Sequence, residues 1–391
     1  MSSRVPIPRD PEDDYTAAMA ARRRDFLAEQ TGAHLKHTAS FSIEPAAVAG
    51  NIENFIGVAQ VPVGLAGPLR INGEHASGDF YIPLATTEGT LVASYSRGMR
   101  LLSECGGVTV TVAKHAMQRA PVFIFDNARG AREFGRWLVE YFEDIKAAAE
   151  STTSIGRLTD IEQYAVANML YTRFNYTTGD AAGQNMTGKA TWAACEWIKA
   201  QHPDRPKYLL SGSIDTDKKH SAVNTLRTRG KRVIAEATIS NEVVQRLMRV
   251  DTQTLFRARQ ISMAGSFLAG SANNGPHAAN GLAAMFIATG QDAANVAESH
   301  AGITYAQLLD NGDYYWSVTL PSLIVASYGG GTGLPTQREC LEMLGCYGKG
   351  KADRLAEIVA AVVLAGDVSL GSAVLAGDWV SSHDRLGRNR P

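Results

Sequence analysis

The chain has few cysteines, almost no net charge and no apolar N-terminal run. Its four cysteines form no C-x-x-C pair, which excludes a disulfide scaffold and favours a reducing compartment. A formal net charge of −1 offers no general attraction for nucleic acid or anionic lipid. We find no signal peptide and no charge-free apolar stretch long enough to span a bilayer. We therefore expect a cytoplasmic protein with no nucleic-acid partner and no membrane.

Signatures of several common enzyme classes are also missing. The sequence has no G-x-G-x-x-G of a Rossmann site, no G-x-S-x-G and no H-E-x-x-H. Two G-x-x-x-x-G-K segments, Gly183 to Ala190 and Gly345 to Ala352, end in alanine where Mg²⁺ binding needs Ser or Thr. His34 and His37 have no third ligand nearby, so we expect no metal site. These absences exclude a P-loop triphosphatase and weaken hydrolase interpretations.

What is present indicates a folded α+β protein of more than one domain. A length of 391 residues with 45% hydrophobic content exceeds one ordinary core. Residues 1–50 are predicted as an N-terminal helical extension. Residues 51–120 and 210–391 are predicted as one large, mainly helical domain, in which strands are expected at few places, such as 81–84.

A smaller inserted domain is predicted at 121–209. Its pattern predicts strand 121–125, a long helix 127–150, strands 157–163 and 168–177, helix 184–200 and strand 207–210. This β-α-β-β-α-β order is that of a ferredoxin-like domain. The glycine-rich turn at 177–183 before the second helix could offer N–H groups to a phosphate.

The large domain is expected to surround a buried helix at about 277–289, because that stretch is apolar on all sides. A glycine- and serine-rich loop is predicted before it, from 265 to 276, and a helix at about 351–366 near the end of the chain. Asp292 follows the buried helix, where the helix dipole disfavours a carboxylate unless a cation is close. A lysine partner and a simple turn role both remain open for Asp292.

Composition alone gives three further segments ordinary structural roles with no catalytic function. Glu88 after two threonines could be an ordinary acid in the first turn of a helix. The run 211–220, with Asp-Lys-Lys, resembles an exposed charged loop. His383 lies in a polar tail and is solvated on this interpretation.

Several blocks taken in order point to one family. They are ENFIG from Glu53, VPVGLAGPL, ATTEG around Glu88, TDKK around Lys218, HAAN, GQDAA, GGGT and the terminal SSH. Together they resemble the 3-hydroxy-3-methylglutaryl-CoA reductase family from Glu53 to the tail. The resemblance implies reduction of 3-hydroxy-3-methylglutaryl-CoA (HMG-CoA) to mevalonate and free CoA by two NADPH, with a dinucleotide site that is not a Rossmann fold.

The resemblance assigns four catalytic residues. Lys218 would stabilise the oxyanion that forms as the thioester carbonyl accepts a hydride. His383 would protonate the departing thiolate, and Glu88 would supply a proton to the second reduction. Asp292 would bridge Glu88 and Lys218, which would give that carboxylate its cation.

The resemblance also implies the binding residues and the assembly. ENFIG corresponds to a dimer segment, so a homodimer or higher homo-oligomer is expected, with its site between subunits. The substrate would be held by Ser94, Arg119, Ser211, Lys219, His277 and Asn280. The cofactor would be held by Thr153, Ser154, Asp180, Ala182, Gln184, Asn185, Met186, Asn389 and Arg390.

The chain departs from the family pattern at a few of these places. Ile261 stands where a substrate-facing lysine is expected, and Ser154 where an arginine would face the 2′-phosphate of NADPH. Ala182 and Gln184 replace methionines, and Ser213 replaces an asparagine. Two alternatives to the reductase are therefore kept: a CoA-thioester lyase or hydrolase that reuses Lys218 and His383, and a non-catalytic acyl-CoA-binding homologue.

Overall fold

The computed structural model describes residues 4–271 and 273–377 of the chain. Three predicted site residues, His383, Asn389 and Arg390, lie outside the described residues. Their assignments therefore remain predictions from sequence.

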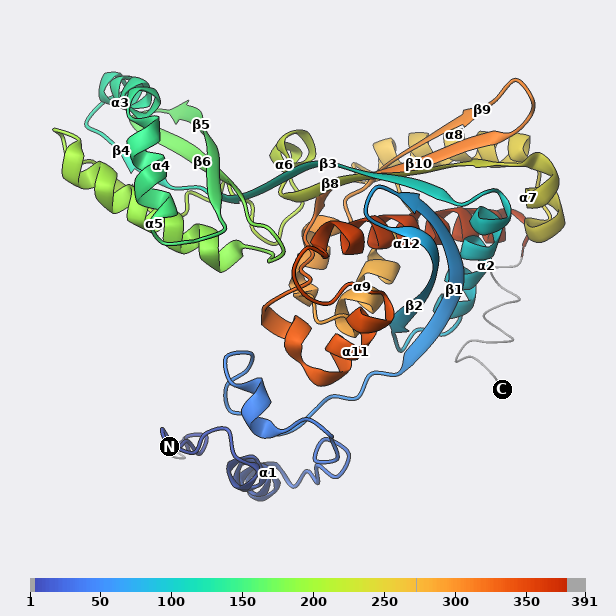
Figure 1. The fold of residues 1–391 in the computed structure, drawn as a ribbon, viewed down its shortest axis with the longest axis horizontal. Helices are drawn as coiled ribbons and strands as arrows, with labels where there is room; N and C mark the ends of the chain where they lie inside the picture. The colour runs from blue at the N-terminus through green and yellow to red at the C-terminus, as the bar shows by residue number, and fades with distance from the viewer. Residues whose placement is uncertain (1–3, 272, 378–391) are drawn as a thin grey trace.

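One continuous sheet runs through the molecule (Figure 1). Its strand order is β7-β4-β6-β3-β8-β10-β9, with β1 paired to β2 and β3, and β5 paired to β6. Most neighbours are antiparallel, and β1 with β3 is parallel. The strands are β1 (Val63–Gly73), β2 (Ser77–Ala85), β3 (Val108–Arg119), β4 (Val122–Ile124), β5 (Arg157–Val166), β6 (Met169–Thr177), β7 (Lys207–Leu209), β8 (Gly230–Ile239), β9 (Ile303–Leu308) and β10 (Tyr314–Leu323).

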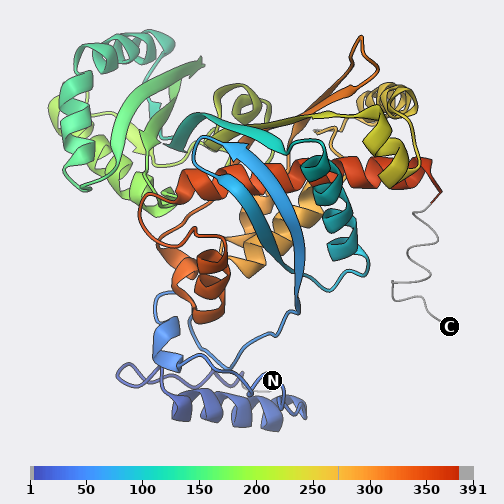
Figure 2. The same cartoon turned by 45° about the vertical axis from the view of Figure 1, so that its right-hand side comes forward.

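The largest hydrophobic cluster lies where two apolar helices meet the sheet. Helix α9 (Ala278–Ala288) confirms the predicted buried helix, since seven of its residues are buried. Helix α12 (Ala352–Leu375) is buried along nearly its whole length and crosses behind β1 and β2 (Figure 2). The other helices are α2 (Leu91–Glu104), α6 (Ala222–Arg227), α7 (Asn241–Met248), α8 (Thr252–Leu268), α10 (Val296–Ser299) and α11 (Pro335–Met343), with 3-10 turns η2 (Ala293–Asn295) and η3 (Gly330–Gly333).

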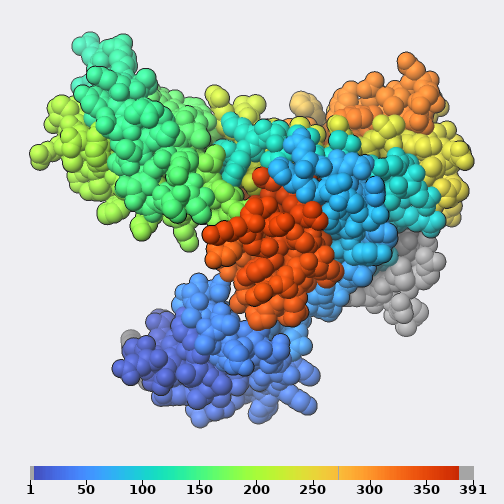
Figure 3. All heavy atoms as spheres, viewed as in Figure 1, coloured from blue at the N-terminus to red at the C-terminus, as the bar shows by residue number. Residues whose placement is uncertain are grey.

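A second cluster of buried residues lies between the sheet and α3 (Ala128–Glu140), α4 (Phe142–Glu150) and α5 (Gln184–Gln201). The predicted order of elements is present here, except that the long helix divides at Tyr141 into α3 and α4. The four strands of this part lie in the order β7-β4-β6-β5 and are antiparallel. Figure 3 shows this part as a separate lobe in green.

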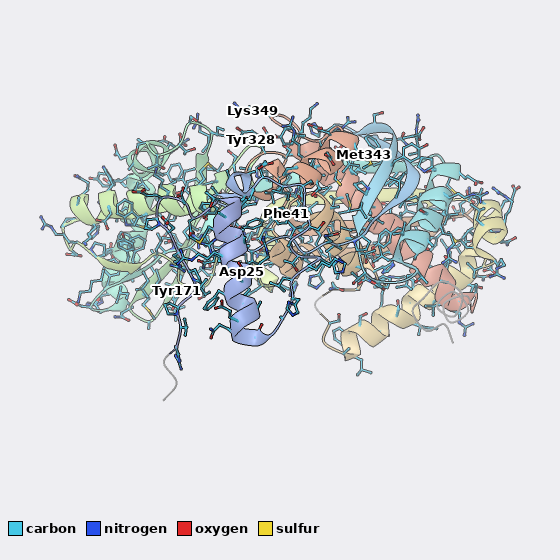
Figure 4. All side chains as sticks on the ribbon, turned by 90° about the horizontal axis from the view of Figure 1, so that it is seen from below. Asp25, Phe41, Tyr171, Tyr328, Met343 and Lys349 are labelled. Atoms are coloured by element: carbon cyan, nitrogen blue, oxygen red, sulfur yellow. The ribbon has the colours of Figure 1, made fainter. Side chains whose placement is uncertain are left out.

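The N-terminal segment packs beneath the large cluster and is held by a buried arginine. Helix α1 (Ala17–Thr31) and the 3-10 turn η1 (Pro45–Val48) belong to it. Arg23 donates to the carbonyls of Pro8, Asp14 and Phe55 and pairs with the Asp14 carboxylate. Figure 4, viewed from below, shows α1 with Asp25 in front of the rest of the chain. Within residues 1–50, which were predicted as a helical extension, the α-helix covers Ala17–Thr31.

Several sequence-based expectations for the large part were wrong. Residues 265–268 continue helix α8 instead of forming a loop. The expectation of few strands understated the sheet, because β1, β3, β8, β9 and β10 were not predicted. Helix α12 extends beyond 366 to Leu375.

Helix α12 comes near to the charge-free apolar stretch that the sequence was expected to lack, although Asp367 interrupts it. Its 18-residue window has a mean hydropathy of 2.1, sufficient by length and composition. However, 78% of that window is buried inside the protein. This burial is that of a core helix.

Candidate active site

Lys218 and Asp292 form an ion pair, as the resemblance implied. Lys218 Nζ lies 3.0 Å from Asp292 Oδ2, and both side chains are close to half exposed. The hydrogen bond to Asp292 raises the pKa of Lys218 above its ordinary value. The other carboxylate oxygen of Asp292 accepts from the N–H of Ala294 and caps η2. The lysine therefore stays charged at neutral pH, held by a carboxylate in a fixed position.

The loop that carries Lys218 has an unusual backbone. Ser213, Thr216 and Lys218 all have φ between 52° and 67°, in the left-handed region that side chains disfavour. Such strain persists only where surrounding contacts impose it, and it gathers at functional sites. The backbone N–H of Lys218 donates to Glu298 Oε1 at 3.2 Å.

Three predicted substrate residues lie on or beside this loop. Arg119 pairs with Asp215 at 3.2 Å, and Ser211 donates to the same carboxylate at 3.1 Å. Lys219 Nζ is exposed and donates to the carbonyl of Asp217 at 3.2 Å. Cations and hydroxyls at this point suit a substrate carboxylate.

A cavity of about 690 Å³ is lined in part by Asp292, the partner of Lys218. The start of α5 contributes four of the predicted cofactor residues to its wall, and Asp292 contributes another part. Tyr328 and the glycine turn 329–331, which belongs to the GGGT block, also line it. The predicted residues in the wall are Ala182, Gln184, Asn185 and Met186.

Asp180 caps the N-terminus of α12. Its carboxylate accepts from the backbone N–H groups of Gly350, Lys351 and Ala352, the last at the start of α12. These contacts satisfy the free N–H groups of a helix N-terminus. Asp180 thus anchors the loop that leads to α5, and the sequence did not indicate this.

Thr153 and Ser154 lie in the turn before β5. Thr153 Oγ1 lies 3.2 Å from the sulfur of Met186 and accepts from the N–H groups of Ile155 and Gly156. The carbonyl of Ser154 accepts from Arg157 Nη2 at 3.2 Å. Arg157 therefore places a half-exposed guanidinium beside Ser154, and sequence reasoning missed it.

The remaining predicted residues gather elsewhere, near the first turn of α9. Asn280 Nδ2 lies 3.1 Å from His277 Nδ1 and 3.5 Å from Glu88 Oε1. Burial lowers the pKa of His277 to about 4, so its imidazole is neutral at pH 7. Ser94 Oγ lies 3.2 Å from Ser369 Oγ.

Within this second group, His277 is packed against Tyr95. The Tyr95 hydroxyl donates to the carbonyl of His277 at 2.7 Å, and the two rings lie 4.8 Å apart. A Cβ at Gly281 would lie 2.4 Å from the Tyr95 hydroxyl, and a Cβ at Gly366 would lie 2.4 Å from the tyrosine ring, so both positions need glycine. Asp367 Oδ1 accepts from the N–H of His277 at 2.8 Å, and burial raises the pKa of Asp367 to about 7.

The predicted catalytic residues thus fall into two groups at opposite ends of α9. Glu88 reaches Asn280 in the first turn, whereas Asp292 follows the end of the helix. The helix from Asn280 to Ala288 rises roughly 12 Å at about 1.5 Å per residue. Of the predicted bridge, the contact between Asp292 and Lys218 is formed, whereas the Glu88 carboxylate contacts Asn280.

The chain is similar in sequence to known reductases. The chain is 44% identical to the 3-hydroxy-3-methylglutaryl-coenzyme A reductase of Methanocaldococcus jannaschii, over 94% of this chain and 92% of that protein. It is 45% identical to the reductase of the same name from Aeropyrum pernix, over 94% and 89%.

The fold is also similar to that of a solved structure. A class II 3-hydroxy-3-methylglutaryl-CoA reductase from Streptococcus pneumoniae, solved with NADPH in open conformations, superposes with a TM-score of 0.70. It is 21% identical, and the match covers 91% of this chain and 86% of that one. The family model for hydroxymethylglutaryl-coenzyme A reductase matches residues 19–388. The chain therefore belongs to the hydroxymethylglutaryl-coenzyme A reductase family.

Proposed function

We propose that this protein reduces HMG-CoA to mevalonate and CoA with two NADPH, as an enzyme of the mevalonate pathway. The observation that carries this proposal is the Lys218–Asp292 ion pair at the edge of the cavity lined by the start of α5. A fixed ammonium beside a dinucleotide-sized opening is the arrangement that hydride transfer to a carbonyl needs. The family and the archaeal relatives named above support the substrate.

Lys218 stabilises negative charge on the carbonyl oxygen in both reductions. In the first, a hydride adds to the thioester carbon and the oxygen becomes a hemithioacetal oxyanion. The carbon–sulfur bond then breaks, giving an aldehyde and a thiolate that takes a proton. We assign that proton to His383, on the sequence resemblance alone. In the second reduction a hydride adds to the aldehyde, and Glu88 supplies the proton of the new alcohol.

The cavity residues fit a dinucleotide. When bound, NADPH supplies the hydride. The N-terminus of α5 at Gly183 and Gln184 has free N–H groups and a positive dipole end, which suit a pyrophosphate. Arg157, beside Ser154, is placed to meet a 2′-phosphate in the absence of the family's arginine. Residues 121–209 would then act as the NADP-binding domain.

We further propose that the active site forms between two copies of the chain. Glu88, Ser94, His277 and Asn280 lie at one end of α9, and Lys218 with Asp292 lies at the other. A symmetric homodimer would bring one group from each copy together, because a two-fold interface repeats each contact twice. One chain alone would then lack a complete proton-transfer set.

NADPH absorbance with and without HMG-CoA tests the function. The reductase consumes two NADPH for each CoA thiol released. A lyase or hydrolase would release the thiol without loss of NADPH, and a binding homologue would do neither. Either of these last two outcomes overturns the proposal.

A further inference from the structure

A glutamate outside the predicted catalytic set touches the backbone of Lys218. Glu298 belongs to α10, and its side chain is fully buried. Its Oε1 accepts the N–H of Lys218 at 3.2 Å. Its Oε2 lies 2.9 Å from Nε of Arg229, which is also fully buried. Burial raises the pKa of Glu298 to about 7, and the positive charge of Arg229 opposes that rise.

Arg229 extends this contact to the residue before the lysine. Its Nη2 donates to Asp217 Oδ1 at 2.8 Å, and its Nη1 donates to the carbonyl of Gln118 in β3 at 3.1 Å. The guanidinium thus ties the loop of Lys218 to the sheet and to α10. A rigid planar fork suits three such contacts better than a lysine would.

The segment 292–298 contacts Lys218 at its side-chain ammonium and at its backbone N–H. Asp292 at the start of η2 pairs with its ammonium, and Glu298 six residues later holds its backbone N–H. The lysine has φ of 56°, a conformation that needs an external constraint. A strained backbone fixed at one end and a paired ammonium at the other leave the side chain little freedom.

Asp217, which Arg229 binds, also bonds to the start of α5, where the cofactor is proposed to bind. Gln184 Nε2 donates to Asp217 Oδ1 at 3.1 Å and to Asn295 Oδ1 at 3.0 Å. Asn295 lies between Asp292 and Glu298 in the chain. Gln184 at the start of α5 therefore bonds to the loop that carries Lys218 and to the segment that carries Asp292.

We propose that Glu298, with Arg229, is a positioning residue that sets the direction of the Lys218 ammonium toward Asp292 and the reacting carbonyl. This proposal rests on the proposed function for its kinetic consequence only. Glu298 is enclosed by protein and acts through the lysine. A displacement of about 1 Å in a catalytic group can cost roughly 10²-fold in rate, so loss of the contact should lower kcat strongly.

The test compares Glu298 with a second buried glutamate. Glu357 of α12 is fully buried and accepts from the N–H groups of Glu74, His75 and Ala76, in the β1–β2 hairpin. It is a matched control, because Glu357→Gln also disturbs a buried carboxylate. Glu298→Ala should lower kcat by about 10²-fold while KM for NADPH changes little. Glu298→Gln, whose amide oxygen still accepts from Lys218, should recover part of that loss. Glu357→Gln should lower stability and leave kcat unchanged.

A second readout needs no catalysis. Pulse acetylation of folded protein over a pH range, followed by peptide mass spectrometry, gives the pKa of the Lys218 amine. In the wild type this pKa should lie above the ordinary lysine value. It should fall toward that value in Glu298→Ala, less in Glu298→Gln, and not at all in Glu357→Gln.

The outcomes separate this proposal from the proposed function. A normal kcat and an unshifted Lys218 pKa in both Glu298 variants would overturn it, as would equal effects of Glu357→Gln. If Glu298→Ala does not fold, Glu298→Gln decides on the same two measurements. A wild type that fails to oxidise NADPH would end the proposed function, whereas the acetylation result would still decide whether Glu298 positions Lys218.

Discussion

The two ends of α9 carry comparable polar groups in opposite surroundings. At the first turn, His277 is 6% exposed, packed on Tyr95 and bonded through its N–H to the buried Asp367. After the last turn, Lys218 and Asp292 are 44% and 42% exposed. His277 at the first end is a packed core residue whose geometry is fixed by burial, while Glu88 at the same end is exposed. The other end is an open ion pair whose geometry depends on a strained loop.

This difference predicts which end governs stability and which governs rate. Exposed ion pairs contribute about 0–1 kcal/mol to stability, so changes at Lys218 should leave folding almost intact. Buried hydrogen-bonded groups cost about 1–3 kcal/mol when a partner is removed. Changes around His277 should therefore lower the free energy of unfolding more than they lower kcat.

The largest effect is expected at the exposed end. Lys218→Ala should reduce kcat by about 10²–10³-fold, because one donor to the developing oxyanion is lost. The melting temperature should move little. Lys199→Ala on α5 is a control for removal of a lysine charge. Steady-state kinetics that show near-normal turnover for Lys218→Ala would remove the lysine from catalysis.

The next effect concerns pH at the buried end. The pKa of His277 is about 4 in the folded protein, against an ordinary value of 6.5. Between these pH values the imidazole is protonated in the unfolded chain and neutral in the folded protein. Its contribution to stability is complete above pH 6.5 and is lost as the pH falls through 4, by up to about 3 kcal/mol. The raised pKa of Asp367 acts in the opposite direction as the pH rises toward 7.

Subtraction isolates the histidine. The unfolding free energy of the wild type minus that of His277→Asn, measured by denaturant titration, should increase between pH 4 and 6.5 and then level off. A difference that does not vary with pH would show that His277 titrates normally in the folded protein.

A smaller effect should follow from the tyrosine that supports His277. Tyr95→Phe leaves the carbonyl of His277 without its 2.7 Å donor. We expect a loss of about 1–3 kcal/mol in unfolding free energy and a modest change in kcat. If thermal unfolding is unchanged and kcat collapses instead, the buried end has a direct chemical role.

An effect of similar size is expected at Arg157, on the cofactor side of the exposed end. A charge-assisted bond from its guanidinium to a 2′-phosphate would contribute about 1.5–3 kcal/mol. Arg157→Ala should then lower the NADPH/NADH ratio of kcat/KM by roughly tenfold or more. Arg136→Ala on α3, an exposed arginine of the same lobe, is the control. An unchanged ratio would leave Ser154 and Thr153 as the only candidates in that turn.

Local sequence patterns were sufficient to predict some of the helices and strands of this structure. The apolar run before Gly290 predicted α9, and the order of elements from 121 to 209 was read from local periodicity. The dipole argument at Asp292 left a cation partner and a turn role open, and the structure has both, because Asp292 pairs with Lys218 and caps η2. In each case the signal lies within one element or at its end.

Long-range partners were not predictable in the same way. β1 is rich in glycine and proline and pairs across an irregularity between Ala66 and Leu69, so its composition indicated irregular backbone. The buried Glu298 and the helix-capping Asp180 depend on partners far away in the chain. The position of Glu88 beside Asn280, away from Asp292, follows from how β2 and α2 pack on α9 and not from the ATTEG block itself.

The most direct test of the account mixes two inactive variants. Glu88→Ala and Lys218→Ala are unfolded together, refolded as a mixture and assayed for NADPH oxidation with HMG-CoA. If the two ends of α9 from different subunits share one site, half of the dimers are hybrids with one intact site of two, which gives about one quarter of wild-type activity. If both residues act within one chain, every site in the mixture lacks one of them. Activity no higher than that of the separate variants would therefore contradict the account.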